Sequence, residues 1–143
     1  MPRVAAWLLR AALLCLALGF TAGALMLASK GIAWGEGGDL NTYLRPAHRE
    51  LLLVGWTIQL VMGVAFWIFP RQRLGSLPYG REWLGWLALG LLNGGVLLIV
   101  IGSLMNASHA TFQILGRFAE LGAATALSVN LWGRVRPFGL SQI

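Results

Sequence analysis

The sequence predicts an all-α membrane protein: a four-helix transmembrane bundle that forms a single domain over residues 1–143, with both termini cytoplasmic. Of the 143 residues, 57% are hydrophobic and only 11% are charged, whereas an ordinary soluble domain carries about 25% charged residues. The mean hydropathy is +0.71. Apolar residues gather in four runs, each near the roughly 20 residues that a bilayer-spanning helix needs: residues 4–29, 48–69, 83–104 and 110–132.

The first run resembles a cleaved signal peptide only superficially. Arg3 and Arg10 precede an apolar stretch over residues 11–28, but the apolar core of a signal peptide is only about 7–15 residues long. Met26 also stands where a cleavage site would need a small residue. We therefore expect this segment to be retained as the first membrane helix.

Prolines mark the predicted limits of the second and fourth helices. Pro46 precedes the second run, Pro70 follows it, and Pro137 follows the fourth. Proline lacks a backbone donor and interrupts helices. These positions predict a long loop from Lys30 to Ala47 and a second helix that begins at His48.

Basic residues predict the orientation of the chain. Seven arginines lie beside the termini and in the second loop: Arg3, Arg10, Arg71, Arg73, Arg81, Arg134 and Arg136. The opposite side carries Lys30, Arg45 and Arg49. Because basic residues accumulate in cytoplasmic loops, we expect a multi-pass protein of a bacterial cytoplasmic membrane with both termini inside. The net charge of +6 reflects this topology, so no nucleic-acid partner is expected.

The sequence offers few residues for catalysis. Cys15 is the single cysteine, which excludes an internal disulfide framework and cysteine-rich metal sites. The chain has no phosphate-binding loop, no nucleophile–base–acid triad and no general acid–base pair of carboxylates. We therefore do not expect it to be an enzyme on its own.

The two histidines, His48 and His109, are candidate metal ligands. Each is predicted to open a helix that runs inward from the outer face, so the imidazoles are expected at nearly the same depth. Gly55 and Gly116 each follow a histidine by seven residues, two helical turns along the same face, where a flat macrocycle would need space. Two imidazoles without a carboxylate or thiolate cluster suit haem better than a structural zinc ion.

Other interpretations of these polar and small residues stay open. A histidine near a helix end can face water or cap the helix, and small residues in membrane helices often serve close helix packing. Arg117 and Glu120 lie three residues apart in the fourth run, and they predict a mutual or interhelical ion pair, because a lone charge in the bilayer is costly. Such a pair either fixes helix packing or serves a proton or a haem propionate.

Three segments around the second run carry a family resemblance: LRPAH at residues 44–48, LLLVGW at 51–56 and FWIFPR at 66–71. They resemble the second helix of the catalytic-subunit family of the haem–copper oxidases. The nearest branches are the cbb3-type oxidases, the nitric oxide reductases and the NnrS-like membrane proteins. The resemblance covers one helix well and a second one weakly.

The resemblance implies that haem b is the cofactor, with His48 and His109 as its axial ligands and Arg45 beside a propionate. Arg49 is expected to help compensate the propionates. Members of the family have many more helices and further histidines for a high-spin haem and a copper ion, whereas this chain has two histidines. We therefore expect a short four-helix relative without an oxygen- or nitric-oxide-reducing centre.

Together these features predict a membrane b-type cytochrome that carries one electron through a single bis-histidine haem near the outer face. Its expected partners are the lipid bilayer and a membrane redox complex or an outer-side electron-transfer protein, and the sequence is compatible with a homo-oligomer. Two alternatives remain. One is a haem-free accessory or assembly subunit of a larger respiratory or photosynthetic membrane complex, and the other is a gas or quinone sensor, which would need a dissociable ligand or an apolar slot.

Overall fold

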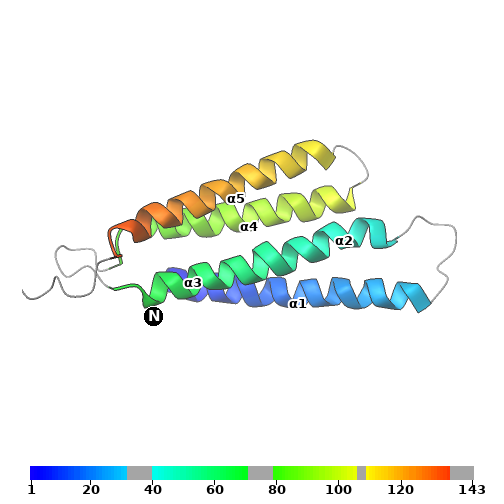
Figure 1. The fold of residues 1–143 in the computed structure, drawn as a ribbon, viewed down its shortest axis with the longest axis horizontal. Helices are drawn as coiled ribbons and strands as arrows, with labels where there is room; N and C mark the ends of the chain where they lie inside the picture. Colours follow the sequence, from blue (N-terminus) through cyan, green and yellow to red (C-terminus); the bar gives the residue numbers. More distant parts are fainter. Residues whose placement is uncertain (32–39, 71–78, 106–108, 136–143) are drawn as a thin grey trace, which may run out of the picture.

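The computed structural model describes residues 1–31, 40–70, 79–105 and 109–135, and its elements there are all helical. They form four rods that lie side by side (Figure 1). The first, third and fourth rods are α1 (Arg3–Gly31), α4 (Glu82–Leu104) and α5 (His109–Trp132). The second rod is continuous and consists of α2 (Leu40–Glu50), the π-helical segment η1 (Leu51–Ile58) and α3 (Gln59–Ile68).

Three of the rods are long and apolar enough to cross a membrane: Arg3–Lys30, Leu40–Ile68 and Glu82–Leu104. The prediction of a helical, multi-pass membrane protein in contact with lipid is confirmed at this level. α5 has 24 residues but is less apolar, and it is not among the three. Some residues used to predict the topology lie outside the described part of the chain: Arg71, Arg73, Arg136 and Pro137.

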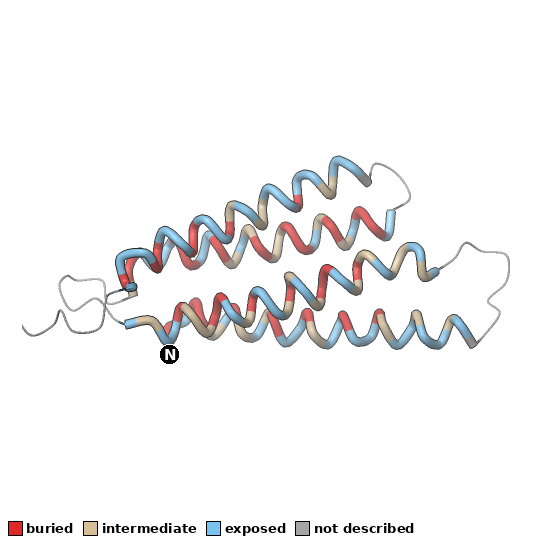
Figure 2. The backbone as a smooth tube through the Cα atoms, in the orientation of Figure 1, coloured by how far each residue is buried: buried red, intermediate tan, exposed pale blue. Residues whose placement is uncertain are grey.

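The main core lies at the end of the bundle that holds the N-terminus, where all four rods contribute buried side chains. It is formed by Val4, Ala5, Leu8, Met62, Phe66, Leu84, Ala88, Leu92, Ala123, Ala126, Leu127 and Leu131. Towards the other end burial decreases (Figure 2), and no residue of α1 between Gly23 and Lys30 is buried. The bundle is therefore closely packed at one end and more open at the other.

The rods pair as two hairpins. α1 packs on the rod formed by α2, η1 and α3, while α5 packs on α4, and contacts of α2 with α4 join the two hairpins (Figure 1). α5 therefore has one principal neighbour. Large apolar side chains on its remaining faces are exposed: Ile114, Leu115, Phe118, Leu121, Val129 and Trp132.

Arg134, just after α5, closes the packed end of the bundle. The residue is 1% exposed. Nε donates to the carbonyl of Pro70 at 3.1 Å, and Nη2 donates to the carbonyls of Phe66 and Phe69 at 2.9 and 2.6 Å. The guanidinium also lies over the rings of Phe66 and Tyr79, 5.4 and 5.9 Å from their centroids. One side chain thus ties the end of the fourth rod to the end of the second.

The second rod begins eight residues earlier than predicted, at Leu40 rather than His48. Pro46 lies inside α2 and does not end the helix. Since α2 packs against both α1 and α4, tertiary contacts outweigh the local cost of the proline. His48 therefore lies within a helix, and the prediction that it opens one is wrong. His109 does open α5, as predicted.

The middle of the second rod is a π-helix, which the sequence did not indicate. In a π-helix the hydrogen bonds join residues five apart. The hydroxyl of Thr57 follows the same spacing, since Oγ1 donates to the carbonyl of Leu52 at 2.9 Å. Segments of this kind are uncommon and are often found at functional sites. Here the segment directly follows Glu50.

Candidate functional site

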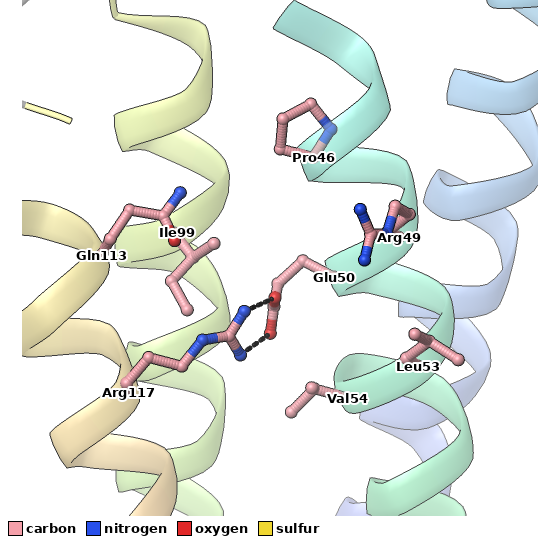
Figure 3. Close-up of a pocket in the computed structure, with 8 residues that line it drawn as sticks. All are labelled: Pro46, Arg49, Glu50, Leu53, Val54, Ile99, Gln113 and Arg117. Atoms are coloured by element: carbon pink, nitrogen blue, oxygen red, sulfur yellow. Dashed lines mark hydrogen bonds and ion pairs between the residues drawn. The ribbon is translucent and has the colours of Figure 1, made fainter. Parts of the chain in front are cut away.

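A polar cavity of about 270 Å³ lies between the two hairpins. α2 and η1 line one side of it, and α4 and α5 line the other (Figure 3). The lining residues are Pro46, Arg49, Glu50, Leu53, Val54, Ile99, Gln113 and Arg117. The cavity thus brings together charged side chains that are far apart in the sequence.

Arg117 joins the two walls of this cavity. Its Nη2 donates to Oε2 of Glu50 at 2.7 Å and its Nη1 donates to Oε1 at 3.1 Å, so the guanidinium meets the carboxylate in a bidentate arrangement (Figure 3). Nη1 also donates to Oε2 of Glu120 at 2.7 Å. The side chains of Glu50 and Glu120 are only 5% and 12% exposed, whereas that of Arg117 is 54% exposed. The predicted pairing of Arg117 with Glu120 is confirmed, and an interhelical partner, Glu50, is added.

Glycines allow α4 and α5 to approach closely beside this cluster. A Cβ atom at Gly95 would lie 2.8 Å from the carbonyl oxygen of Gly116 and 2.9 Å from Cγ of Glu120. Any larger residue at position 95 would push α5 away from α4. The close crossing therefore positions Glu120 against α4. Arg117 lies about one turn before Glu120 on the same helix, so its position is set as well.

The cluster leaves hydrogen-bond donors available to a ligand. A guanidinium has five N–H donors, and the carboxylates of Glu50 and Glu120 use three of those of Arg117. Gln113 lies one turn before Arg117 on α5 and lines the same cavity. Within the described residues, its side-chain amide has no hydrogen-bond partner.

A second hollow, an apolar groove of about 300 Å³, lies along α5. It is lined by Gln113, Ile114, Arg117, Phe118 and Leu121. The polar cavity and the apolar groove therefore share Gln113 and Arg117. Polar donors at one end and an apolar wall at the other suit a ligand with a polar head and an apolar tail.

His48, the first predicted haem ligand, faces α1. Its Nδ1 donates to the carbonyl of Gly19 at 2.8 Å, and a Cβ atom at Gly23 would lie 2.8 Å from its Cε1. Nε2 has no hydrogen-bond partner among the described residues. His109 is the first residue of α5, and its side chain lies outside the described part of the structure. The pairing of the two imidazoles stays a prediction.

The other predicted cofactor residues are spread over two faces. Arg45 and Arg49 are exposed on α2, and only Arg49 of the two lines the cavity. A Cβ atom at Gly55 would meet Cys15 of α1 at 2.8 Å, and one at Gly116 would meet Ile99 of α4 at 2.5 Å. Neighbouring helices fill the space beside both glycines, in keeping with the packing role that the sequence left open for them.

Glu50 and Gln113 are the residues of this site that the sequence analysis missed. An acidic residue two positions inside the predicted second span was a usable signal for Glu50, because charges are rare in such segments. Gln113 carried no comparable signal. Within the described ranges, no group of three or more histidine, cysteine, aspartate or glutamate side chains could hold a metal ion.

Comparisons of the chain with protein-family models, with curated proteins and with solved structures found no match. The resemblance to the haem–copper oxidases therefore stays a prediction from the sequence.

Proposed function

We propose that the chain is a membrane protein that binds a membrane quinone at Gln113 and Arg117. The observation that carries the proposal is that the two hollows lie next to each other, since the polar cavity and the apolar groove share these residues. Ligand sites commonly combine apolar walls with a few placed polar groups. A quinone has carbonyl oxygens that accept hydrogen bonds and an apolar tail, which matches this division.

In this proposal α5 is a fourth span, both termini are cytoplasmic, and the membrane is the bacterial cytoplasmic membrane. The packing of α5 against α4, which is itself apolar and long enough to cross, supports the fourth span. The excess of arginines beside the termini and in the second loop of the sequence supports the orientation. Arg117 then lies about 12 Å along the helix from His109, at a rise of about 1.5 Å per residue, and the more open end of the bundle faces outward.

Charge balance favours a neutral head group over a phosphate. The positive charge of Arg117 is offset by the carboxylate of Glu50 and by a second carboxylate at Glu120. A phosphate would find no unpaired positive charge on Arg117, whereas a carbonyl oxygen needs only N–H donors. The remaining donors of Arg117 and the amide of Gln113 supply them. Arg49, the other cation that lines the cavity, is exposed.

Binding of a short-tailed ubiquinone analogue to the purified protein in detergent tests this proposal by isothermal titration calorimetry. We expect saturable binding. The change Gln113→Leu should raise the Kd about fivefold, since one hydrogen bond contributes about 1 kcal/mol. Phe118→Ala should raise it by at least as much because it removes part of the groove wall. Phe20→Ala is the matched control, since Phe20 on α1 and Phe118 are similarly exposed, at 63% and 67%.

Two outcomes would contradict the quinone proposal. One is an equal Kd for the wild type, Gln113→Leu and Phe118→Ala, which would place any binding elsewhere. The other is displacement of the analogue by phosphatidylglycerol at stoichiometric amounts, which would assign the site to a phospholipid head group.

A second candidate function, one-electron transfer by a b-type cytochrome, is favoured by the setting of His48. Metal-ligating histidines commonly donate their other ring N–H to a carbonyl or carboxylate. The Nδ1 bond to Gly19 supports such a role and leaves Nε2 directed elsewhere. In this proposal His48 and His109 hold haem b, with Arg45 and Arg49 beside the propionates. When bound, the haem supplies a one-electron couple.

The cytochrome proposal is tested by a reduced-minus-oxidised absorption spectrum of protein purified from haem-replete cells. We expect b-type bands in the wild type, and a loss of most of the band intensity in His48→Ala and in His109→Ala. Gln113→Leu should keep them. A wild-type protein without b-type bands would remove this candidate and would leave the quinone proposal unaffected.

A further inference from the structure

The ion-pair cluster contains one more carboxylate than it has guanidinium groups. Glu50 and Glu120 both accept hydrogen bonds from Nη1 of Arg117, so the two acids share one cation. α4, the partner of α5 in the second hairpin, faces the cluster with Gly95 and Ile99. If both acids are ionised, the three side chains carry a net charge of minus one.

Few other titratable groups lie near the cluster. On α4 the sole titratable side chain is Glu82, at the opposite end of the helix, and neither η1 nor α3 contains any. On α2, Arg49 lines the cavity but is exposed, and His48 faces α1. Within the described residues, no second cation forms an ion pair with Glu50 or Glu120.

One oxygen of the cluster is buried without a partner. Oε1 of Glu120 is inaccessible and makes no hydrogen bond within the described part of the chain, although Oε2 of the same carboxylate is bonded to Arg117. An ionised oxygen held away from both water and donors is strongly disfavoured. A proton on this oxygen removes the excess charge.

We infer that the cluster binds one exchangeable proton, with Oε1 of Glu120 as the atom placed to receive it. Glu50 and Arg117 then form the ionic pair, and Glu120 is a neutral carboxylic acid that still accepts a hydrogen bond at Oε2. The cavity lined by Glu50 and Arg117 lies beside the cluster, and we expect this proton to exchange through it. The inference goes beyond quinone binding and does not depend on it.

Infrared spectroscopy of the ligand-free protein tests the inference, because a protonated carboxyl group has a C=O stretching band that an ionised one lacks and that shifts in D₂O. At neutral pH we expect one such band in the wild type. It should vanish in Glu120→Gln and also in Glu50→Gln, because in each variant a single carboxylate remains to pair with Arg117. It should double in intensity in Arg117→Gln, where neither acid has a counter-charge.

Glu82→Gln is the control, since this acid lies at the far end of α4 and is exposed, and it should leave the band unchanged. Circular dichroism melting of each variant establishes that the helices are intact. A wild type without the band, or a band that persists in Glu120→Gln, would overturn the inference. Quinone titrations of the same samples test the proposed function separately. A failure of the quinone proposal can therefore be told apart from a failure of the protonation inference.

Discussion

Replacing Arg134 by methionine should lower the free energy of unfolding by about 3 kcal/mol. The change removes charge-assisted hydrogen bonds to the carbonyls of Pro70, Phe66 and Phe69, and such bonds contribute about 1.5–3 kcal/mol each. Nη1 of Arg134 is buried without a hydrogen-bond partner among the described residues, and the change also relieves this cost, so the summed loss is smaller than three full bonds. Unfolding by sodium dodecyl sulfate in mixed micelles, followed by circular dichroism, measures the change.

Two further variants separate this role from a general effect of charge. Arg81→Met removes an exposed arginine at the same end of the bundle and should change the free energy of unfolding by no more than about 0.5 kcal/mol. Arg134→Lys keeps the charge, but the single ammonium group of lysine lacks the forked donors of a guanidinium and cannot bond to all three carbonyls. It should therefore recover only part of the lost free energy of unfolding. Equal destabilisation by Arg134→Met and Arg81→Met would refute the clamp.

A single methyl group at Gly95 should destabilise the hairpin of α4 and α5 by about 1–3 kcal/mol, the usual cost of overpacking. The Cβ atom of Gly95→Ala would meet the carbonyl oxygen of Gly116 at 2.8 Å, and backbone cannot move aside as a flexible side chain can. The helices must therefore separate along their crossing. The same detergent unfolding experiment measures this loss.

Neighbouring glycines in α4 provide matched controls. A Cβ atom at Gly94 or Gly90 would meet nothing within 4 Å. Gly94→Ala and Gly90→Ala should therefore be neutral or stabilising by up to about 1 kcal/mol, because alanine favours helix over glycine. An equal free energy of unfolding for Gly95→Ala and Gly94→Ala would contradict the close approach of α4 and α5 at Gly95.

The sequence predicted the helices best where apolar runs define them. Three rods begin and end within about two residues of their predicted limits, because the length of an apolar run follows from the thickness of the bilayer. The exception is α2, whose residues are mostly polar and contain Pro46. Its helix is stabilised by contacts with α1 and α4, and contacts between segments leave little trace in a single sequence.

The candidate site could be predicted only in part for a similar reason. The pair of Arg117 and Glu120 follows from helical spacing alone. The contact of Arg117 with Glu50 joins residues 67 positions apart, and predicting it requires knowing which helices are neighbours. The direction of His48 towards Gly19 also depends on that arrangement. The seven-residue spacing between each histidine and the following glycine could not show which neighbouring helix the histidine faces.

The winding of η1 decides where the charged end of the second rod is aimed. Each residue of an α-helix advances about 100° around the axis. A π-helix advances less per residue because each of its hydrogen bonds spans one more residue. Over Leu51–Ile58 this deficit accumulates and swings the preceding turn, with Glu50, around the axis relative to α3. With regular α-helical winding through the same residues, the carboxylate of Glu50 would point in a different direction around the helix axis. The bridge between the hairpins thus depends on backbone pitch as well as on the choice of side chains.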